Sequence, residues 1–371
     1  MRNIMRLGDV ASYVNGFPFK PSDWSDMGVP IIRIQDLTGN GYQMNRFDGK
    51  YDAKYEVRAG DVLISWSASL GVYVWKLETA VLNQYIFKVR FDKVDVDKDF
   101  FVYQVECLLK KAARQAHGAT MRHLTKPVFD GLPFYLPPKE EQKRIAVQLN
   151  AITHLISLRQ RQAEKLDELV KARFVEMFGE CKYRGNPLSN VCKLITDRTH
   201  QPPQFVDAGI PFLLVSNLVH NEITYDTEKF ISKESYQELI KRTPVEIGDI
   251  LLSIVGSYGH AGVVRTDKPF CFQRHIAYIK PDFSKLNSEF LHQALLSDAV
   301  KYQMEKRVKG IAQKTLNLSE LKKIVVPIPP LALQTEFSHF VHEVDREKER
   351  IQRSAALLET LKRSLMQQYF G

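Results

Sequence analysis

The sequence predicts two tandem copies of a mixed α/β domain, each followed by a long α-helix. A double proline with a glutamine four residues later occurs twice, in "LPPKEEQ" at 136–142 and "IPPLALQ" at 328–334. A long segment without proline or glycine follows each of them, and segments of similar sequence precede them. At 371 residues the chain is also longer than one ordinary hydrophobic core requires.

The segments before the double prolines align with each other. "LGDVASYVNGFPFKPSDWSDMGVPIIRIQDLTGN" from position 7 matches "LSNVCKLITDRTHQPPQFVDAGIPFLLVSNLVHN" from position 188, and "VRAGDVLIS" at 57–65 matches "VEIGDILLS" at 245–253. Gly118 and Leu124 correspond to Gly310 and Leu316, and "MFG" at 177–179 corresponds to "YFG" at 369–371. We conclude that the chain contains two copies of one unit.

Strands and helices are expected in the same order in both copies. In the first, "VPIIRIQDL", "GDVLISW", "LGVYVWKL" and "NQYIFKVRF" are β-branched apolar runs, and "DKDFFVYQVECLLKKAARQA" has helical character. In the second, the strands are "IPFLLVSNL", "GDILLSIV", "AGVVRT" and "RHIAYIKP", and the helix is "SEFLHQALLSDAVKYQMEKRV". These patterns assign 1–138 and 180–330 to two α/β domains.

Residues 139–179 and 331–371 are expected to form two helices of about forty residues, roughly 60 Å long at 1.5 Å per residue. Each carries a strict heptad stripe that is apolar apart from two basic residues. An ordinary surface helix could explain one such stripe, but two matched stripes favour an antiparallel coiled coil with pseudo-twofold symmetry. The stripes are Ile145, Leu149, Ile152, Ile156, Arg159, Ala163, Leu166, Val170, Arg173 and Met177, and Phe337, Val341, Val344, Lys348, Ile351, Ala355, Leu358, Lys362, Leu365 and Tyr369.

Known catalytic motifs do not fit this sequence. The glycines of "GSYGHAG" at 256–262 lack dinucleotide-binding spacing, and "KGIAQKT" at 309–315 lacks the glycine of a P-loop. "QPPQF" at 201–205 differs from the loop of adenine methyltransferases, and His339 and His342 have no evident third metal ligand. The four cysteines form no Cys-x-x-Cys pair, which is typical of reduced thiols. We expect a non-catalytic chain without a metal or a cofactor.

The balance of charge favours a polyanionic partner. Lys and Arg number 52 against 43 Asp and Glu, a net charge of +9. The N-terminus lacks a signal-peptide pattern and no apolar run is long enough for a bilayer, so the sequence predicts a cytoplasmic protein without a membrane partner.

Two basic segments without acidic residues occupy equivalent positions in the two copies. A solvated charge run is the usual explanation of a single cluster, but recurrence favours contact with DNA phosphates. The residues are Lys110, Lys111, Arg114, Arg122, His123 and Lys126 in the first copy, and Lys306, Arg307, Lys309, Gln313 and Lys314 in the second.

Residues that contact base edges should differ between two domains that read different bases. Polar and aromatic side chains at three pairs of unlike loops are the candidates, although a structural role is more common for any single one. They are Lys20 and Trp24 against Arg198, His200 and Gln201; Ser67 and Ser69 against Ser257 and His260; and Gln84 and Tyr85 against Arg274 and His275.

The whole chain resembles the specificity subunit of type I restriction-modification enzymes. The resemblance rests on "LPPKEEQKRI" and "IPPLALQTEF", on "GDVLIS" and "GDILLS", and on the segments from Gly118 to Leu124 and from Gly310 to Leu316. The second box departs from the usual Glu-Gln, because Leu333 precedes its glutamine.

The resemblance implies that each α/β domain is a target recognition domain that reads one half of a bipartite, asymmetric sequence in double-stranded DNA. It implies that the helices set the spacing and dock two modification (methyltransferase) subunits, which restriction (translocase and nuclease) subunits join. S-adenosylmethionine, ATP and magnesium would then belong to those partners. The alternatives are a fused or fragmentary restriction-modification enzyme with its own catalysis, and a coiled-coil adaptor that binds proteins.

Overall fold

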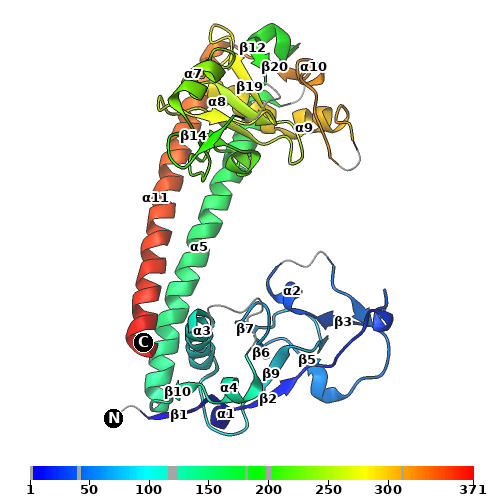
Figure 1. Ribbon diagram of the computed structural model, residues 1–371, viewed down its shortest axis with the longest axis vertical. Coiled ribbons are helices and arrows are strands. Elements are labelled where there is room, and N and C mark those ends of the chain that lie inside the picture. Colours follow the sequence, from blue (N-terminus) through cyan, green and yellow to red (C-terminus); the bar gives the residue numbers. More distant parts are fainter. Residues whose placement is uncertain (1–2, 40–42, 116–123, 180–182, 198–202, 311–312) are drawn as a thin grey trace. The chain divides into compact units, whose positions relative to one another are not determined.

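The computed structural model describes residues 3–39, 43–115, 124–179, 183–197, 203–310 and 313–371. The chain divides into two compact units, which are Met1–Arg159 with Arg353–Gly371, and Gln160–Gln352. Each unit therefore contains one α/β domain and parts of both long helices (Figure 1). We call the α/β domain of the first unit domain 1 and that of the second unit domain 2.

Domain 1 contains two four-stranded sheets. The larger is antiparallel, in the order β2-β9-β6-β7, and the smaller, β4-β3-β8-β5, has β3 and β8 parallel. The strands are β2 Ser12–Asn15, β3 Val29–Ile32, β4 Arg46–Phe47, β5 Glu56–Val57, β6 Val62–Ser65, β7 Gly71–Val74, β8 Ala80–Leu82 and β9 Ile86–Arg90. A two-stranded antiparallel ribbon pairs β1 Ile4–Arg6 with β10 Pro133–Tyr135. The helices are α1 Leu7–Val10, α2 Ile34–Leu37, α3 Lys98–Gln115 and α4 Lys126–Asp130. Two 3-10 turns are η1 Pro21–Asp23 and η2 Ala53–Tyr55.

Domain 2 repeats the topology of the larger sheet and the three-strand centre of the smaller one, where β15-β14-β18 correspond to β4-β3-β8; β13 is added at one edge, and no strand among the described residues corresponds to β5. Its sheets have the orders β12-β19-β16-β17 and β13-β15-β14-β18, and the second again contains one parallel pair, β14 with β18. The strands are β12 Cys192–Thr196, β13 Phe205–Val206, β14 Ile210–Leu213, β15 Phe230–Ile231, β16 Ile250–Ser253, β17 Ala261–Val263, β18 Cys271–Phe272 and β19 Ile276–Pro281. The two-stranded ribbon of domain 2 pairs β11 Gly185–Pro187 with β20 Val325–Pro327. The helices are α6 Leu188–Val191, α7 Lys233–Ile240, α8 Ser288–Leu296, α9 Asp298–Glu305 and α10 Leu318–Leu321, and the 3-10 turn is η3 Val215–Leu218.

One sequence-based expectation for domain 2 was wrong. The single helix predicted from 288 onward is divided into α8 and α9 by Ser297, whose backbone is extended. The Ser297 side chain accepts a hydrogen bond from Val300 N and so caps α9. Serine followed by Asp298 is a helix-start signal, which overrides the continuous apolar period.

The two predicted long helices are present as α5 Lys139–Phe178 and α11 Leu331–Phe370. Every residue of both predicted heptad stripes is buried or half-buried. In the first unit, Ile145 and Leu149 share a hydrophobic core with Leu365 and Phe370. In the second unit, the ring centroids of Phe174 and Phe337 are 5.6 Å apart. In each unit the beginning of one helix thus packs on the end of the other, which is antiparallel pairing.

A buried phenylalanine ends each long helix inside a domain core. Phe370 of α11 packs edge-on against Phe100 of domain 1 at 5.5 Å, and Phe178 of α5 packs on Phe290 of domain 2 at 4.8 Å. Phe100 and Phe290 are both completely buried. The repeated "FG" ending therefore marks an anchoring side chain, and each helix starts on one domain and ends on the other.

The repeated glutamine has a structural explanation. The Gln142 amide Nε2 donates to the Pro137 carbonyl at 2.8 Å, and its Oε1 accepts from the backbone N–H of Asp97 at 2.8 Å, just before α3. Gln334 makes the equivalent bonds to Pro329 O at 2.9 Å and from Asn287 N at 2.8 Å, just before α8. The residue before each glutamine makes weaker contacts: the Tyr135 hydroxyl lies 3.5 Å from Glu141 Oε1, and the half-buried Leu333 packs at the edge of the core of the second unit, so the position accepts either residue.

Replacing Gln142 by alanine should destabilise the first unit. Gln142 is only 2% exposed, so the change leaves a backbone carbonyl and an N–H without their partner at a cost of about 2 kcal/mol. Denaturant unfolding of the full chain measures this loss. Glu141→Leu, which copies the second repeat, is the matched control and should change the unfolding free energy by less than about 0.5 kcal/mol. Equal effects of the two changes would contradict this role of Gln142.

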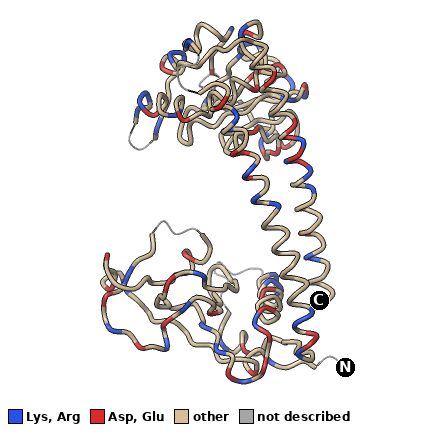
Figure 2. Tube along the Cα trace, turned by 180° about the vertical axis from the view of Figure 1, so that it is seen from behind, with Lys and Arg blue, Asp and Glu red and all other residues tan. Residues whose placement is uncertain are grey.

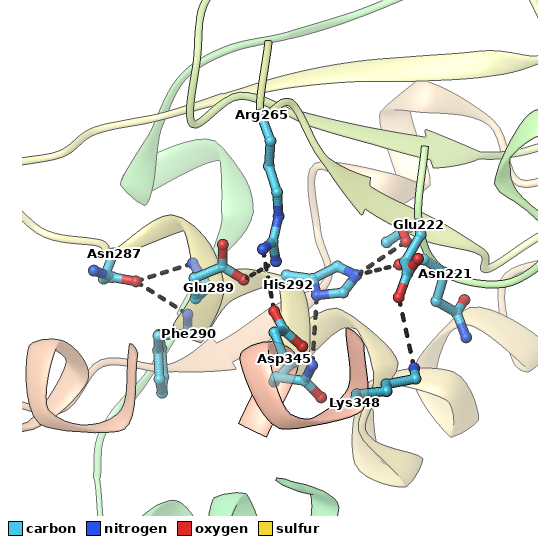
Figure 3. A network of polar contacts seen from close by, with 11 residues as sticks. Asn221, Glu222, Arg265, Asn287, Glu289, Phe290, His292, Asp345 and Lys348 are labelled. Atoms are coloured by element: carbon cyan, nitrogen blue, oxygen red, sulfur yellow. Dashed lines mark hydrogen bonds and ion pairs between the residues drawn. The ribbon is translucent and has the colours of Figure 1, made fainter. Parts of the chain in front are cut away.

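Charged residues join domain 2 to α11, and α11 to α5, within the second unit; Figure 3 shows the contacts between domain 2 and α11. Arg265 pairs with Glu289 of α8 at 3.0 Å and with Asp345 of α11 at 3.1 Å. Lys348 of α11 pairs with Asp167 of α5 at 2.9 Å. Between these pairs lies buried His292, whose Nε2 is 3.0 Å from both the Asn221 and the Ala261 carbonyl oxygens (Figure 3). Since carbonyls can only accept, Nε2 carries a hydrogen.

Acidification should destabilise the second unit through His292. Burial lowers the pKa of His292 below its ordinary 6.5, so the unfolded chain binds a proton that the folded chain does not. Stability is therefore retained above pH 6.5 and lost below it, at up to about 1.4 kcal/mol per pH unit. Denaturant unfolding between pH 7.5 and 5.5 measures this slope. His292→Gln, which keeps an N–H donor, should reduce the slope, whereas His339→Gln on the exposed face of α11 should not.

Candidate nucleic-acid interface

Three segments of domain 1 meet at the end of β6. The Trp66 backbone N–H donates to Tyr85 O at 3.2 Å, and the Leu124 N–H donates to Trp66 O at 3.0 Å. The Gln84 N–H donates to Phe17 O at 2.9 Å, which adds the loop after β2. These bonds bring together the predicted contact residues Ser67, Ser69, Gln84 and Tyr85.

Domain 2 holds its corresponding segments by two equivalent backbone bonds and one further bond. The Ile254 N–H donates to His275 O at 2.9 Å, and the Leu316 N–H donates to Ile254 O at 2.8 Å. Gly256 N–H donates to Lys314 O at 2.8 Å. The predicted residues Ser257, His260, Arg274, His275 and Lys314 therefore lie on neighbouring segments, with Gln313 and Lys309 exposed beside them.

The turns after β6 and β16 have matching backbones. Ala68 has φ 57° and Gly256 has φ 74°, so both occupy the left-handed region at the same place in the turn. We call these turns, with the segments bonded to them, the loop frame of each domain. Because main-chain bonds hold the frame, unlike side chains can be presented on a common backbone.

Aromatic residues cluster on the loop frame of domain 1. Trp66 stacks on Phe87 with ring centroids 5.4 Å apart and lies 5.4 Å from Tyr85. Tyr85 has φ 69°, a conformation that a tyrosine adopts at some cost, and 42% of it is exposed. Trp66 was missed by the sequence analysis, although its place directly after "GDVLIS" was the available signal.

Several predicted phosphate contacts have partners inside the protein. Lys110 pairs with Glu106 at 2.6 Å, Lys111 donates to Phe370 O at 2.7 Å, and Lys126 pairs with Asp130. Arg307 donates to Gln303 O at 3.0 Å, and Lys306 lies 5.2 Å from the Tyr302 ring. Lys111 thus caps the C-terminal end of α11. Arg114 is exposed at the end of α3, beside a pocket of about 570 Å³ lined by Leu70, Tyr73 and Lys110.

Lys20 and Trp24 lie on another part of domain 1, beside the smaller sheet. The Arg33 guanidinium lies 5.4 Å from the centre of the exposed Trp24 ring. In domain 2 the exposed Phe205 occupies the aligned position, and the Lys229 ammonium lies 4.9 Å from its ring centre. Phe205 was also missed, because its partner Lys229 is distant in sequence. The predicted residues Arg122, His123, Arg198, His200 and Gln201 lie outside the described residues.

The charge state of single side chains on the loop frame matters more than the overall charge of either domain. Charged residues of both signs are spread over both domains (Figure 2). Partial burial lowers the pKa of His260 and of His275 below the ordinary value, so both side chains are neutral near pH 7. These two histidines can therefore act as hydrogen-bonding groups rather than as phosphate-binding cations.

The described part of the chain offers little for a metal or a membrane. Its His, Cys, Asp and Glu side chains form no group of three or more that could hold a metal ion. Among the helices built from the described residues, none is both long and apolar enough to cross a membrane.

Comparison with known proteins decides the family. A family model described as "Type I restriction modification DNA specificity domain" matches residues 3–168 and 187–359. The chain belongs to this family. The match confirms the family resemblance seen in the sequence, and it covers both domains together with most of α5 and α11.

Curated relatives and solved structures agree with this assignment. The chain is 26% identical to the EcoBI specificity subunit of Escherichia coli, over 98% of this chain and 84% of that protein. It is 22% identical to the MjaVIII specificity subunit of Methanocaldococcus jannaschii, over 95% of this chain and 89% of that protein. Its fold matches the S subunit from M. genitalium with a TM-score of 0.54 at 14% identity, covering 100% of this chain and 96% of that one. A chain from a structure addressing assembly and conformational transition of the type I R-M system gives a TM-score of 0.59 at 17% identity, covering 99% and 97%.

The chain is thus the DNA specificity subunit of a type I restriction-modification system, and it is the non-catalytic part of that complex. Members of the family carry no cofactor, because the cofactors belong to the modification and restriction subunits. The complex joins the specificity subunit with DNA and with those two kinds of subunit.

Changing Tyr85 to glycine should weaken DNA binding but leave the free energy of unfolding nearly unchanged. Glycine removes the cost of the left-handed backbone but raises the entropy of the unfolded chain, so the unfolding free energy should stay within about 1 kcal/mol of the wild-type value. Loss of the exposed ring should weaken DNA binding by at least ~1 kcal/mol. Denaturant unfolding and binding titrations of the assembled complex measure the two effects.

Ala68→Gly is the matched control, because it alters the backbone at the other left-handed position of the same loop frame without removing a ring. It should leave both stability and DNA affinity almost unchanged. If Tyr85→Gly binds DNA as tightly as the wild type, the ring has no part in the interface.

Proposed function

We propose that domain 1 and domain 2 each read one half of a bipartite, asymmetric DNA target. In this proposal the segments 1–138 and 180–330 act as target recognition domains and the segments 139–179 and 331–371 act as spacer helices. The observation that carries the proposal is the loop frame. Two domains that share two equivalent backbone bonds present Ser67, Gln84 and Tyr85 in one case and Ser257, Arg274 and His275 in the other.

The paired helices are proposed to set the gap between the half-sites. Each is anchored by its glutamine at the start and its phenylalanine at the end, so a change in helix length has to move an anchor. The exposed basic residues Arg114, Lys309 and Lys314 are the proposed phosphate contacts. The remaining predicted contact residues stay candidates in the same proposal.

The outer faces of the helices support docking of the two modification subunits. Large apolar side chains are exposed there, among them Val147 and Val175 of α5 and Leu357 and Leu361 of α11. Leu357 is 72% exposed, and Leu361, four residues later on the same face of α11, is also exposed. Neighbouring exposed leucines of this kind are typical of a surface that another protein covers. We propose that the modification subunits cover these side chains, that restriction subunits then join, and that the complex works in the cytoplasm.

The test is the methylation pattern made by this chain when it is co-expressed with its cognate modification subunits. Methylome sequencing should find adenine methylation at one split, asymmetric motif. Exchanging residues 7–130 for the equivalent part of a relative should change one half of the motif, and inserting whole helical turns into both long helices should change its gap. An unsplit motif, or no motif, would contradict the proposal.

The two alternatives predict other outcomes. A fused or fragmentary enzyme would transfer labelled methyl groups to DNA as the purified chain alone. A protein-binding adaptor would show no DNA binding that depends on sequence and weakens with salt.

A further inference from the structure

A chain of hydrogen bonds leads from the core of domain 2 to its loop frame. It begins at His292 of α8, which is buried and whose Nε2–H donates to the Asn221 carbonyl at 3.0 Å (Figure 3). The side chain of Asn221 continues the chain, because its Oδ1 is 3.3 Å from Nδ1 of His260. His260 Nε2 in turn is 3.1 Å from the hydroxyl oxygen of Ser257.

The backbone fixes the two middle members of this chain. Asn221 has φ 58°, a left-handed conformation that asparagine tolerates better than most residues. The His260 N–H donates to the buried Ser253 hydroxyl at 2.9 Å, and Ser253 N–H donates to His260 O at 2.8 Å. The positions of Asn221 and His260 are thus set by the fold before any ligand binds.

The chemistry of the groups sets the direction of each hydrogen bond. The amide oxygen of Asn221 only accepts, so Nδ1 of His260 carries the hydrogen. The imidazole is neutral because burial lowers its pKa, and its Nε2 therefore carries none. Nε2 must accept, so the Ser257 hydroxyl donates its single hydrogen inward to His260.

The outward face of Ser257 is consequently an acceptor. Ser257 is exposed, and it follows Gly256, whose N–H donates to Lys314 O at 2.8 Å. The exposed Lys314 is one of the proposed phosphate contacts. Of the groups that DNA presents in the major groove, hydrogen-bond donors are the exocyclic amino groups of adenine and cytosine.

We propose that Ser257 is a specificity-determining residue of domain 2 that selects an adenine or a cytosine through its amino group, with His260 and Asn221 as positioning residues. This assignment deepens the proposed function and rests on it. The hydroxyl is held as an acceptor by the inward hydrogen bond, so it gives no hydrogen to the oxygen of guanine or thymine. The specificity arises from the fixed direction of the hydrogen bonds.

The test is a double-mutant cycle on the complex with its cognate modification subunits. Methylome sequencing first identifies the motif. Each adenine in the half-site assigned to domain 2 is then replaced by purine, and each cytosine by 2-pyrimidinone, which are the same bases without the amino group. At one position the analogue should weaken wild-type binding by about five- to tenfold, the effect of one hydrogen bond. Ser257→Ala should weaken binding to the natural DNA by a similar factor and should show no further loss with the analogue.

Ser189→Ala is the matched control, because it removes an exposed hydroxyl from domain 2 that bonds to the adjacent Asn190. It should retain the full effect of the analogue. If Ser257→Ala also retains it, or if no analogue weakens the wild type, the assignment is overturned while the proposed function stands. A wild-type complex that methylates no split motif overturns both.

Asn221→Asp tests the positioning residues by their effect on base preference. A carboxylate at this position favours protonated His260, whose Nε2–H then donates to Ser257 and turns the hydroxyl hydrogen outward. Among the described residues, the charged or titratable groups around His260 are Tyr258, Lys301, Glu305 and His220, so the carboxylate adds a new anion beside Nδ1.

Relative affinity should move from the amino-bearing base towards guanine or thymine at that position, and the move should increase as pH falls from 8 to 6. A purely structural role of Asn221 predicts an equal loss for all four bases at every pH. That result would overturn the assignment.

Discussion

The rest of this structure depends on one buried amide in each unit. Gln142 and Gln334 each bond to a proline carbonyl on one side and to the backbone N–H before a domain helix on the other. The double proline ends the preceding ribbon and permits the first helical turn, since proline needs no N–H partner there. The amide then joins that turn to the domain core, so the direction of each long helix is fixed at its first residues.

The other end of each long helix is held by a single buried phenylalanine. Phe178 and Phe370 insert their rings beside Phe290 and Phe100, which lie on α8 and α3. The glutamines bond to the backbone N–H groups of the residues that cap these two helices, Asn287 and Asp97. One domain helix therefore receives the start of one long helix and the end of the other. Because both contacts are buried, each unit contains residues from both repeats in one hydrophobic core. Each domain completes its core with residues from the other repeat.

Much of this arrangement could be predicted from the sequence, because it repeats and is periodic. The duplicated frame, the forty-residue helices and their seams all came from patterns that a single sequence contains. The candidate interface was less predictable, since it depends on contacts between distant segments. Nothing in the sequence shows that Lys111 caps α11 or that Asn221 lies between two histidines. Trp66 and Phe205 were missed because a single sequence does not show whether an aromatic residue is buried or exposed.

The place of Phe370 has a consequence for synthesis. A ribosome delivers domain 1 first, yet the ring that packs on Phe100 comes after the whole of domain 2 in the chain. Phe100 of domain 1 therefore lacks its packing partner until α11 leaves the ribosome. The order of translation thus leaves this part of the core of domain 1 uncovered until the last residues of the chain have been made.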